Sequence, residues 1–408
     1  MFSLSKFIPP LNMGMLLLAL FPILKYYGTP FTFSWGELLL LLFVIFNILA
    51  KGRKAFIFPK HFISYWVYCT VTTILITDTF KLTNLIPGGI STFIWCLMLG
   101  VLIPVSDTNT LLKYFRLLFF PIAALFVIQE ITYAATGDRF VFHLPISSET
   151  AYYGDLSFHQ LEILYKYSER SASIFMEPAY LASFLLMHLC LELFSEKEVE
   201  KLYTPVSVLI VMILLVLRSG TGLIGLALLG SIKLISYYKR TKSSKIIALM
   251  FIILPLLYVG ATYYISTEIG ESMLKRQTEL SNQSGSSYER IFRGIELYGI
   301  MPVQNQIYGI DLSVFREGTN YNGVETIDKG MLFNGFMTIL VSKGLIGMIL
   351  LLWVYISIYR NRESGVLTKA SLLLLLLLSW IESIYMSPVM LILTIVAYSG
   401  CRRSYNNF

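Results

Sequence analysis

Two charged residues stand at the start of a long apolar stretch of this sequence. In the segment SERSASIFMEPAYLASFLLM, residues 168–187, Arg170 and Glu177 precede a run of apolar side chains. If the segment is helical, their spacing of seven residues is about 700° of rotation, so both side chains share one face. Pro178 then lies inside the predicted helix, where it is expected to kink the helix and free the carbonyl of Ile174. Ionised groups in a bilayer cost about 2.5–3.5 kcal/mol each, so they are usually kept for a function.

A structural interpretation of the same residues stays open. Arg170 could reach the membrane interface with its long side chain, while Glu177 pairs with a lysine. The shorter carboxylate cannot easily reach the interface, which favours a functional role for Glu177. His188 follows Glu177 by eleven residues and is most simply a buried core histidine.

A second group of arginines lies in a polar stretch further along the chain. Arg290 and Arg293 are three residues apart in SSYERIFRG, so they would point the same way on a short helix. Gly309 follows Arg293 after fifteen intervening residues, and Asp311 comes just after it. A guanidinium fork matches a pair of phosphate oxygens and stays charged at any pH. Several such forks could hold a pyrophosphate without a metal, although an ordinary solvated loop is the alternative.

The composition indicates a membrane protein. Hydrophobic residues make up 56% of the 408 residues, charged residues only 14%, and the mean hydropathy is +0.68, whereas soluble chains carry about 25% charge. The apolar runs are continuous, which predicts helices rather than a barrel. We therefore expect an all-α polytopic protein, one integral membrane domain over 1–408, with about twelve transmembrane helices. The expected spans are 8–28, 31–50, 61–80, 86–105, 113–135, 172–194, 203–218, 220–237, 246–265, 331–357, 365–382 and 386–400.

The lysines and arginines predict the orientation. Alternate short loops carry most of them, which is typical of the cytoplasmic side and places both termini in the cytoplasm. Two long segments, 136–171 and 266–330, then lie outside, together with the turn at Arg218 and with Arg170. The net charge of +7 is explained by these short loops and does not suggest nucleic acid. The basic residues of the predicted inner loops are Lys51, Arg53, Lys54, Lys60, Lys113, Arg116, Lys197, Lys201, Lys239, Arg240, Lys242, Lys245, Arg360, Arg362, Arg402 and Arg403.

Other residues complete the chemical inventory. The outer segments are rich in tyrosine, including Tyr288, and aromatic rings stack on sugar faces, although a membrane-interface belt is the alternative. Glu130, Lys343 and Glu382 are further charges within expected spans, and Lys343 should face the bundle interior and pair with a carboxylate. The four histidines are scattered and no nucleotide-binding motif is present, so no metal or cofactor is expected.

Four segments resemble the bacterial O-antigen and capsular polysaccharide polymerases of the Wzy type, relatives of the O-antigen ligases. RSASIFMEPAYLASFLL looks like the family's Arg-x4-Phe-x-Glu-Pro start of a helix, and LRSGTGLIGLALL looks like its Ser-x-Thr-Gly turn. The spacing of Arg293 and Gly309 is similar to its Arg-x15-Gly pattern. FNGFMTILVSKGLIGMILLL is similar to its Asn-containing return into the membrane. These segments cover about residues 168–350, and the first 160 residues match only by hydropathy. The sequence departs from the family at two points. An Arg-x15-Gly pattern counted from Arg170 fails, because Leu186 occupies the glycine position. Phe333 precedes Asn334 where ligases have a histidine, which weakens a ligase assignment.

The resemblance implies a GT-C-type membrane glycosyltransferase. It would join oligosaccharide repeat units carried on undecaprenyl pyrophosphate at the outer face of the cytoplasmic membrane, with a chain-length regulator and a flippase as partners. The expected catalytic residues are Glu177, Arg170, Arg290, Arg293 and Asp311. The expected substrate-binding residues are Arg218, Tyr288, Asn334, Tyr180 and Gly309. A ligase that transfers the finished glycan and a flippase or other transporter of lipid-linked oligosaccharides are the alternatives.

Overall fold

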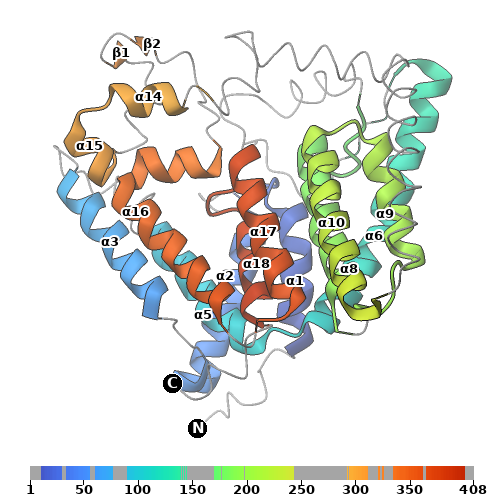
Figure 1. The fold of residues 1–408 in the computed structure, drawn as a ribbon, viewed down its shortest axis with the longest axis horizontal. Helices are drawn as coiled ribbons and strands as arrows, with labels where there is room; N and C mark the ends of the chain where they lie inside the picture. Colours follow the sequence, from blue (N-terminus) through green and yellow to red (C-terminus); the bar gives the residue numbers. More distant parts are fainter. Residues whose placement is uncertain are drawn as a thin grey trace.

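The computed structural model describes residues 11–29, 34–55, 60–76, 90–138, 140, 142, 144, 170–175, 177–196, 198–242, 292, 294–310, 320–321, 324–325, 334–361 and 364–399. Helices dominate this part of the chain (Figure 1). The α-helices are α1 (Leu11–Leu24), α2 (Trp35–Lys51), α3 (Lys60–Ile76), α5 (Ser91–Val105), α6 (Thr108–Thr136), α8 (Pro178–Phe194), α9 (Pro205–Val216), α10 (Gly220–Thr241), α14 (Gly294–Ile300), α15 (Val303–Tyr308), α16 (Gly335–Arg360), α17 (Val366–Ile381) and α18 (Pro388–Ser399).

Two small elements accompany the helices. A 3-10 helix, η2 (Gly52–Ala55), follows α2. Strands β1 (Asn320–Tyr321) and β2 (Val324–Glu325) form an antiparallel pair in which Asn320 lies opposite Glu325. The prediction of an all-helical architecture is therefore confirmed in its main feature.

The apolar helices indicate a membrane-embedded protein. By length and composition, α6, α10 and α16 could cross a membrane, with 29, 22 and 26 residues. Helices α1, α5, α8, α9, α17 and α18 are also apolar but shorter, within 10–17 residues. Every expected span before residue 238 and after residue 330 overlaps a described helix, whereas 246–265 lies outside the described residues.

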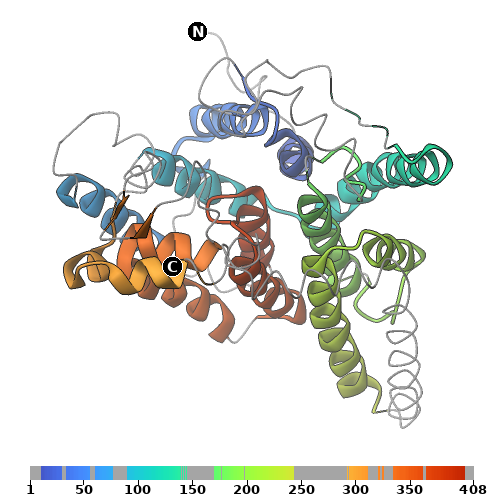
Figure 2. The same ribbon diagram turned by 90° about the horizontal axis from the view of Figure 1, so that it is seen from above.

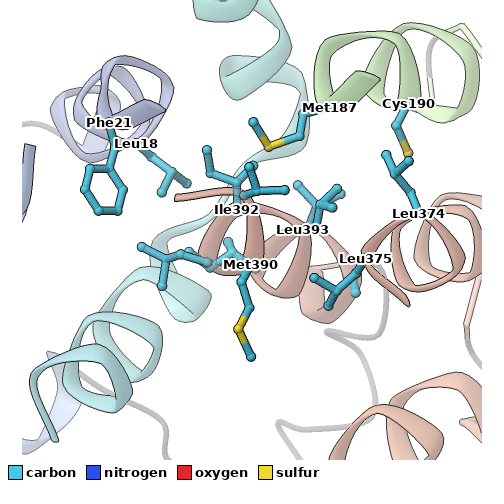
Figure 3. Close-up of a cluster of buried hydrophobic side chains, with 14 of the residues drawn as sticks. Leu18, Phe21, Met187, Cys190, Leu374, Leu375, Met390, Ile392 and Leu393 are labelled. Atoms are coloured by element: carbon cyan, nitrogen blue, oxygen red, sulfur yellow. The ribbon is translucent and has the colours of Figure 1, made fainter. Parts of the chain in front are cut away.

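The core surrounds two helices that are buried on nearly all sides. Every residue of α18 from Pro388 to Tyr398 is buried, and α8 is buried from Leu181 to Phe194. Both are mainly apolar on all sides, as expected of central helices, although α8 carries His188 and Glu192 toward its end. Figure 3 shows Ile392 and Leu393 of α18 beside Met187 of α8, Leu375 of α17 and Leu18 of α1. Because α8 is held so completely, its first turn has a fixed position.

Helix α16 is broken at Gly344. The backbone there has φ 66° and ψ −175°, which is not helical, and Figure 1 shows two segments that differ in direction. The expected single span 331–357 is therefore a broken helix. The amide of Ile310 donates to the carbonyl of Val341 (2.9 Å). The hydroxyl of Tyr68 donates to the carbonyl of Lys343 (2.8 Å). Groups from α3 and from the segment after α15 thus bond carbonyls released by the break.

The helices run between two ends of the bundle. The upper end in Figure 1 carries the starts of α8, α10 and α16 and the turn between α17 and α18. We define it by residues 177–180, 218–222, 334–335 and 382–386. The lower end carries the starts of α6 and α9 and the ends of α8 and α10, and we define it by residues 107–116, 188–207 and 233–242. In Figures 1 and 2, α17 and α18 lie between a group containing α3 and α14–α16 and a group containing α6 and α8–α10.

Candidate functional site at the upper end of the bundle

Helices α8 and α10 run in parallel and begin at the same level. A Cβ atom on Gly222 would lie 3.5 Å from the Cβ of Ala182, and one on Gly225 would lie 2.3 Å from Leu186 Cδ1. Glycine at these positions lets the two helices approach closely, as membrane helices commonly require. Glu177 and Arg218 each precede this contact by about one helical turn. Two residues expected in the site are therefore placed at the same end of the bundle.

The side chain of Glu382 joins the start of α10 to the end of α17. The hydroxyl of Thr221 donates to Glu382 Oε1 (2.5 Å), and the amide of Gly335 donates to the carbonyl of Glu382 (2.8 Å). Glu382 is 4% exposed. Partial positive charge at a helix N-terminus stabilises a nearby carboxylate, and the starts of α10 and α16 both meet this residue. Sequence analysis noted Glu382 only as a charge within a span, because its contact with Thr221 is a tertiary one.

Asn334 caps the start of α16 and is completely buried. Its Oδ1 accepts a hydrogen bond from the amide of Met337 (2.8 Å), which explains the helix start. Its Nδ2 has no hydrogen-bond partner among the described residues, although Asn334 is 0% exposed. A buried amide donor without a partner costs about 1–3 kcal/mol. Asn334, expected as a sugar contact, therefore has spare hydrogen-bonding capacity at the upper end.

The segment before α8 is not helical, which corrects one expectation. Helix α8 begins at Pro178, with Glu177 as its N-cap residue, so Arg170 and Glu177 do not share a helix face. Pro178 occupies the first turn, where its missing N–H is harmless, and does not kink the helix. The helix does not extend back to Arg170, because the chain makes a tight turn in which the amide of Phe175 donates to the carbonyl of Ala172 (3.0 Å).

This non-helical segment is buried against α6. Gln129 Nε2 donates to the carbonyl of Ser173 (3.0 Å), and the amide of Ser173 donates to Gln129 Oε1 (2.7 Å). The hydroxyl of Ser173 donates to the carbonyl of Ile122 (2.8 Å), near the middle of α6. Irregular backbone at membrane depth is tolerated only when it is buried in protein or lines a polar cavity. Residues 171–175 thus hold Arg170 and Glu177 at the two ends of a fixed loop.

Left-handed backbone conformations gather near the upper end. Four non-glycine residues of the described chain have positive φ, and three of them precede a helix there: Ser173 (56°), Arg218 (55°) and Met386 (54°). The fourth, Lys242, ends α10 at the lower end. Such conformations cost about 1–3 kcal/mol each and concentrate at functional sites. Arg218 is therefore held half-buried in a strained turn directly before the Ser219 cap of α10.

Tyr180 lies in the first turn of α8 and stacks on Tyr26, which follows α1. The ring centroids are 4.6 Å apart and the planes differ by 26°. Both side chains are partly buried against the main core. The phenol of Tyr180 is thus placed beside the site end of α8, where it could contact a bound sugar.

Gly309 has a structural explanation in addition to its expected role. Its φ is +89°, and a Cβ there would lie 2.4 Å from the carbonyl oxygen of Ser342. The glycine lets α15 rest directly on the broken part of α16. Arg290, Arg293, Asp311 and Tyr288 lie outside the described residues, so their roles stay predictions.

The structure contains a second polar cluster, at the lower end, which the sequence did not predict as a site. Arg116 Nε and Nη2 donate to the two carboxylate oxygens of Glu192 (2.6 and 2.8 Å), and Nη2 also donates to Glu198 (3.0 Å). Glu192 also accepts from the hydroxyl of Thr204 (3.0 Å) and lies 3.2 Å from His188 Nε2. The expectation that His188 is a buried histidine agrees with its 0% exposure.

The lower cluster extends to the loop after α8 and to α10. Lys201 donates to Glu198 (2.8 Å), and Lys233 Nζ donates to the carbonyls of Leu193 (2.6 Å) and Val199 (3.1 Å). Hydrogen bonds from Lys201 and then Arg116 lower the pKa of Glu198. The spacing of Glu192 and His188, four residues apart on one helix, was the available sequence signal, but the pairing of Glu192 with Arg116 spans 76 positions.

The described residues contain no group of three or more His, Cys, Asp or Glu side chains suited to a metal ion. The fold and the two polar ends thus define an α-helical, membrane-embedded protein with a polar cluster at each end. Comparison with known protein families and with curated proteins finds no match to this chain.

Proposed function

We propose that the chain is a membrane glycosyltransferase that polymerises oligosaccharide repeat units carried on a prenyl pyrophosphate. Its site is the upper end of the bundle, on the outer side of the cytoplasmic membrane. The basic side chains Arg116, Lys201, Lys239 and Arg240 near the lower end support this orientation, because cytoplasmic loops carry such residues.

One observation carries the proposal. Three of the sequence segments that resemble the polymerases, at Glu177, at residues 218–222 and at Asn334, all begin helices that start at the upper end. They are separated by up to 157 residues in the sequence, from 177 to 334. The starts of several helices present amide donors and partial positive charge, which suits an anionic group such as pyrophosphate.

The chemistry needs little beyond charge stabilisation and alignment. The hydroxyl oxygen of an acceptor sugar attacks the anomeric carbon of the donor, and the bond to the pyrophosphate oxygen breaks. The proton passes to a carboxylate, and lipid pyrophosphate leaves with the electron pair. Arginine forks neutralise the charge that develops on the leaving group without a metal.

We assign roles accordingly. Arg170 and Arg218, with Arg290 and Arg293, bind pyrophosphate. Glu177, half-buried at the start of α8, accepts the proton or orients an arginine. Asp311 is the second candidate for that base.

Sugar-binding roles fall to other residues of the site. Tyr180 and Tyr288 contact sugar through an aromatic ring, while Asn334, which is buried, fixes the start of α16 beside the site. Gly309 shapes the neighbouring helix contact. Glu382 orients acceptor hydroxyls from the α17–α18 turn.

The decisive experiment uses purified protein in liposomes with prenyl-pyrophosphate-linked oligosaccharides as substrate. Ladders of products on a gel support a polymerase. A single transfer product indicates a ligase, and transbilayer movement without transfer indicates a transporter; either result overturns the proposal.

Two matched pairs of variants locate the site. Glu177→Gln and Arg218→Lys at the upper end should reduce transfer at least tenfold, since each removes an interaction of about 1.4 kcal/mol or more in the transition state. Glu196→Gln and Arg240→Lys, both exposed at the lower end, should leave transfer unchanged. Equal activity of all four variants would remove the upper end as the site.

A further inference from the structure

Helix α14 and the residues on either side of α15 form an apolar inner face. Leu297 (0% exposed), Met301 and Ile310 pack with Met337 and Val341 of α16 in a small core of their own. The amide of Ile310 donates to the carbonyl of Val341 (2.9 Å), which fixes the pair of short helices to the broken helix. These buried residues are sufficient to hold the two short helices against the bundle.

Large apolar side chains on the same two helices, and Phe292 just before α14, are also exposed. Ile295 is 47% exposed, Val303 70%, and Phe292 and Tyr308 more than 40% each. Short helices that bury one apolar face normally turn a polar face to water. The exposure of these four large apolar side chains therefore indicates a second apolar environment.

The exposed apolar side chains continue onto neighbouring membrane helices. Tyr68 of α3 approaches the carbonyl of Tyr308 at 3.4 Å, so α15 lies directly beside α3. Helix α3 exposes Ile63 and Val67, and α16, which packs against α15, exposes Leu345, Ile349 and Trp353. On α16, a helix long enough to cross a membrane, such side chains face lipid. The outer face of α14 and α15 is contiguous with that surface.

Polar side chains mark the limit of the apolar face. Glu296 follows Ile295, and Gln304 follows Val303, and both polar residues are exposed. Successive positions on a helix differ by about 100°. Each helix therefore presents an apolar and a polar exposed side, which is the pattern of an element seated at a membrane interface.

We propose that α14 and α15 lie in the leaflet at the upper end of the bundle. Ile295 and Val303 insert among lipid acyl chains, while Glu296 and Gln304 face the headgroups and water. This part of the expected outer segment 266–330 is then a membrane-seated element rather than a free aqueous loop. The proposal does not depend on the glycosyltransferase assignment.

Accessibility of spin labels tests the proposal in proteoliposomes. Single cysteines replace Ile295, Glu296, Val303 or Gln304 in a Cys401→Ala background, and the nitroxide label on each is exposed to oxygen or to a water-soluble nickel chelate. Cys69, Cys96 and Cys190 are free but buried, and labelling of the background protein measures their contribution. Ile349→Cys serves as the lipid reference and Lys242→Cys as the aqueous reference.

The expected result is a several-fold higher ratio of oxygen to chelate collisions at 295 and 303 than at 296 and 304. Strong chelate access at 295 and 303, equal to that at Lys242→Cys, would place the helices in water and overturn the proposal. Exclusion of both reagents at 295 and 303 would show cover by protein instead of lipid and would also overturn it. Thermal unfolding of each labelled variant verifies the fold before the ratios are compared.

Discussion

The two ends of the bundle hold polar residues in different ways. At the lower end, two carboxylates meet cationic partners in a chain of hydrogen bonds that joins α6, α8 and the following loop. At the upper end, the starts of α10 and α16 meet at Glu382 through Thr221 and Gly335, and Asn334 precedes Gly335. The two ends are not distinguished by unpaired atoms, since His188 Nδ1 and Ser195 Oγ at the lower end and Asn334 Nδ2 at the upper end all have no described partner. They differ in that both lower carboxylates, Glu192 and Glu198, are paired with cationic side chains.

This difference suggests that the lower end serves mainly the stability of the fold and the upper end mainly the proposed reaction. The ion pairs around the buried Glu192 carboxylate favour one arrangement of helices, because removing Arg116 leaves that charge in an apolar environment. The strained turns near the upper end instead lower stability and persist where the surrounding structure enforces them. We therefore expect substitutions at the lower end to change folding and substitutions at the upper end to change transfer.

The largest expected effect is at Arg116. Arg116→Ala leaves Glu192, whose side chain is 0% exposed, without its bidentate partner and should destabilise the protein by about 3 kcal/mol, the lower part of the range for a broken buried pair. The effect falls in the lower part of that range because the Arg116 side chain is itself 35% exposed. Thermal unfolding in detergent measures the loss, and residual transfer per folded molecule should be unchanged. A normal melting temperature would show that the lower network is not a stabilising element.

The next effect concerns Gly309, where the chain after α15 lies directly against the backbone of α16. Gly309→Ala should destabilise by at least about 2 kcal/mol, since it combines a left-handed residue with a backbone clash. A Cβ there would lie 2.4 Å from Ser342 O. Gly299→Ala in α14 is the matched control, because a Cβ there meets nothing within 4 Å. If both alanines have the same melting temperature, the contact between α15 and α16 does not constrain the fold.

A smaller change in stability, with a large change in activity, is expected at Glu382. Glu382→Gln can still accept the hydrogen bond from Thr221, so it should cost about 1 kcal/mol or less. If Glu382 orients the acceptor, transfer falls at least tenfold. Thr221→Val removes the donor and controls for the hydrogen bond alone. Full transfer by Glu382→Gln would assign the residue to helix packing.

The smallest effect is the pH dependence at Glu198. Its pKa is depressed in the folded protein, first by Lys201. The stabilising contribution is therefore present above the ordinary value of 4.5 and is lost as pH falls through the lower folded pKa. At pH 7, Glu198→Gln should lower the free energy of unfolding by less than about 1 kcal/mol. The melting temperature should fall slightly as a result. The difference from the parent should shrink in acid, and a constant difference would contradict the ion pair.

Much of the fold was predictable because lipid leaves few choices. Continuous apolar runs must form helices to satisfy their own backbone groups, and the expected spans overlap described helices on both sides of the 246–265 segment. The helix start at Pro178 was missed, since the local pattern SASIF is apolar enough to continue a helix. Bonds of Ser173 to Gln129 and Ile122, which are tertiary, hold the segment in a non-helical conformation.

The candidate site was only partly predictable. Glu177, Arg218 and Asn334 were selected as polar residues at the start of apolar segments, and helix starts are visible locally as caps and prolines. Glu382 and its contact with Thr221, and the pairing of Arg116 with Glu192, join residues 161 and 76 positions apart. Such pairs depend on how helices pack, which no local pattern encodes.

The sequence by itself determined the class of protein, the positions of most helices and the polar residues at their ends, because hydropathy and capping act over a few turns of chain. Only the tertiary structure decided which of those ends meet, where α16 breaks and which charges pair. The physical reason is that lipid specifies helices one by one, while close packing at glycines and hydrogen bonds between helices select their partners.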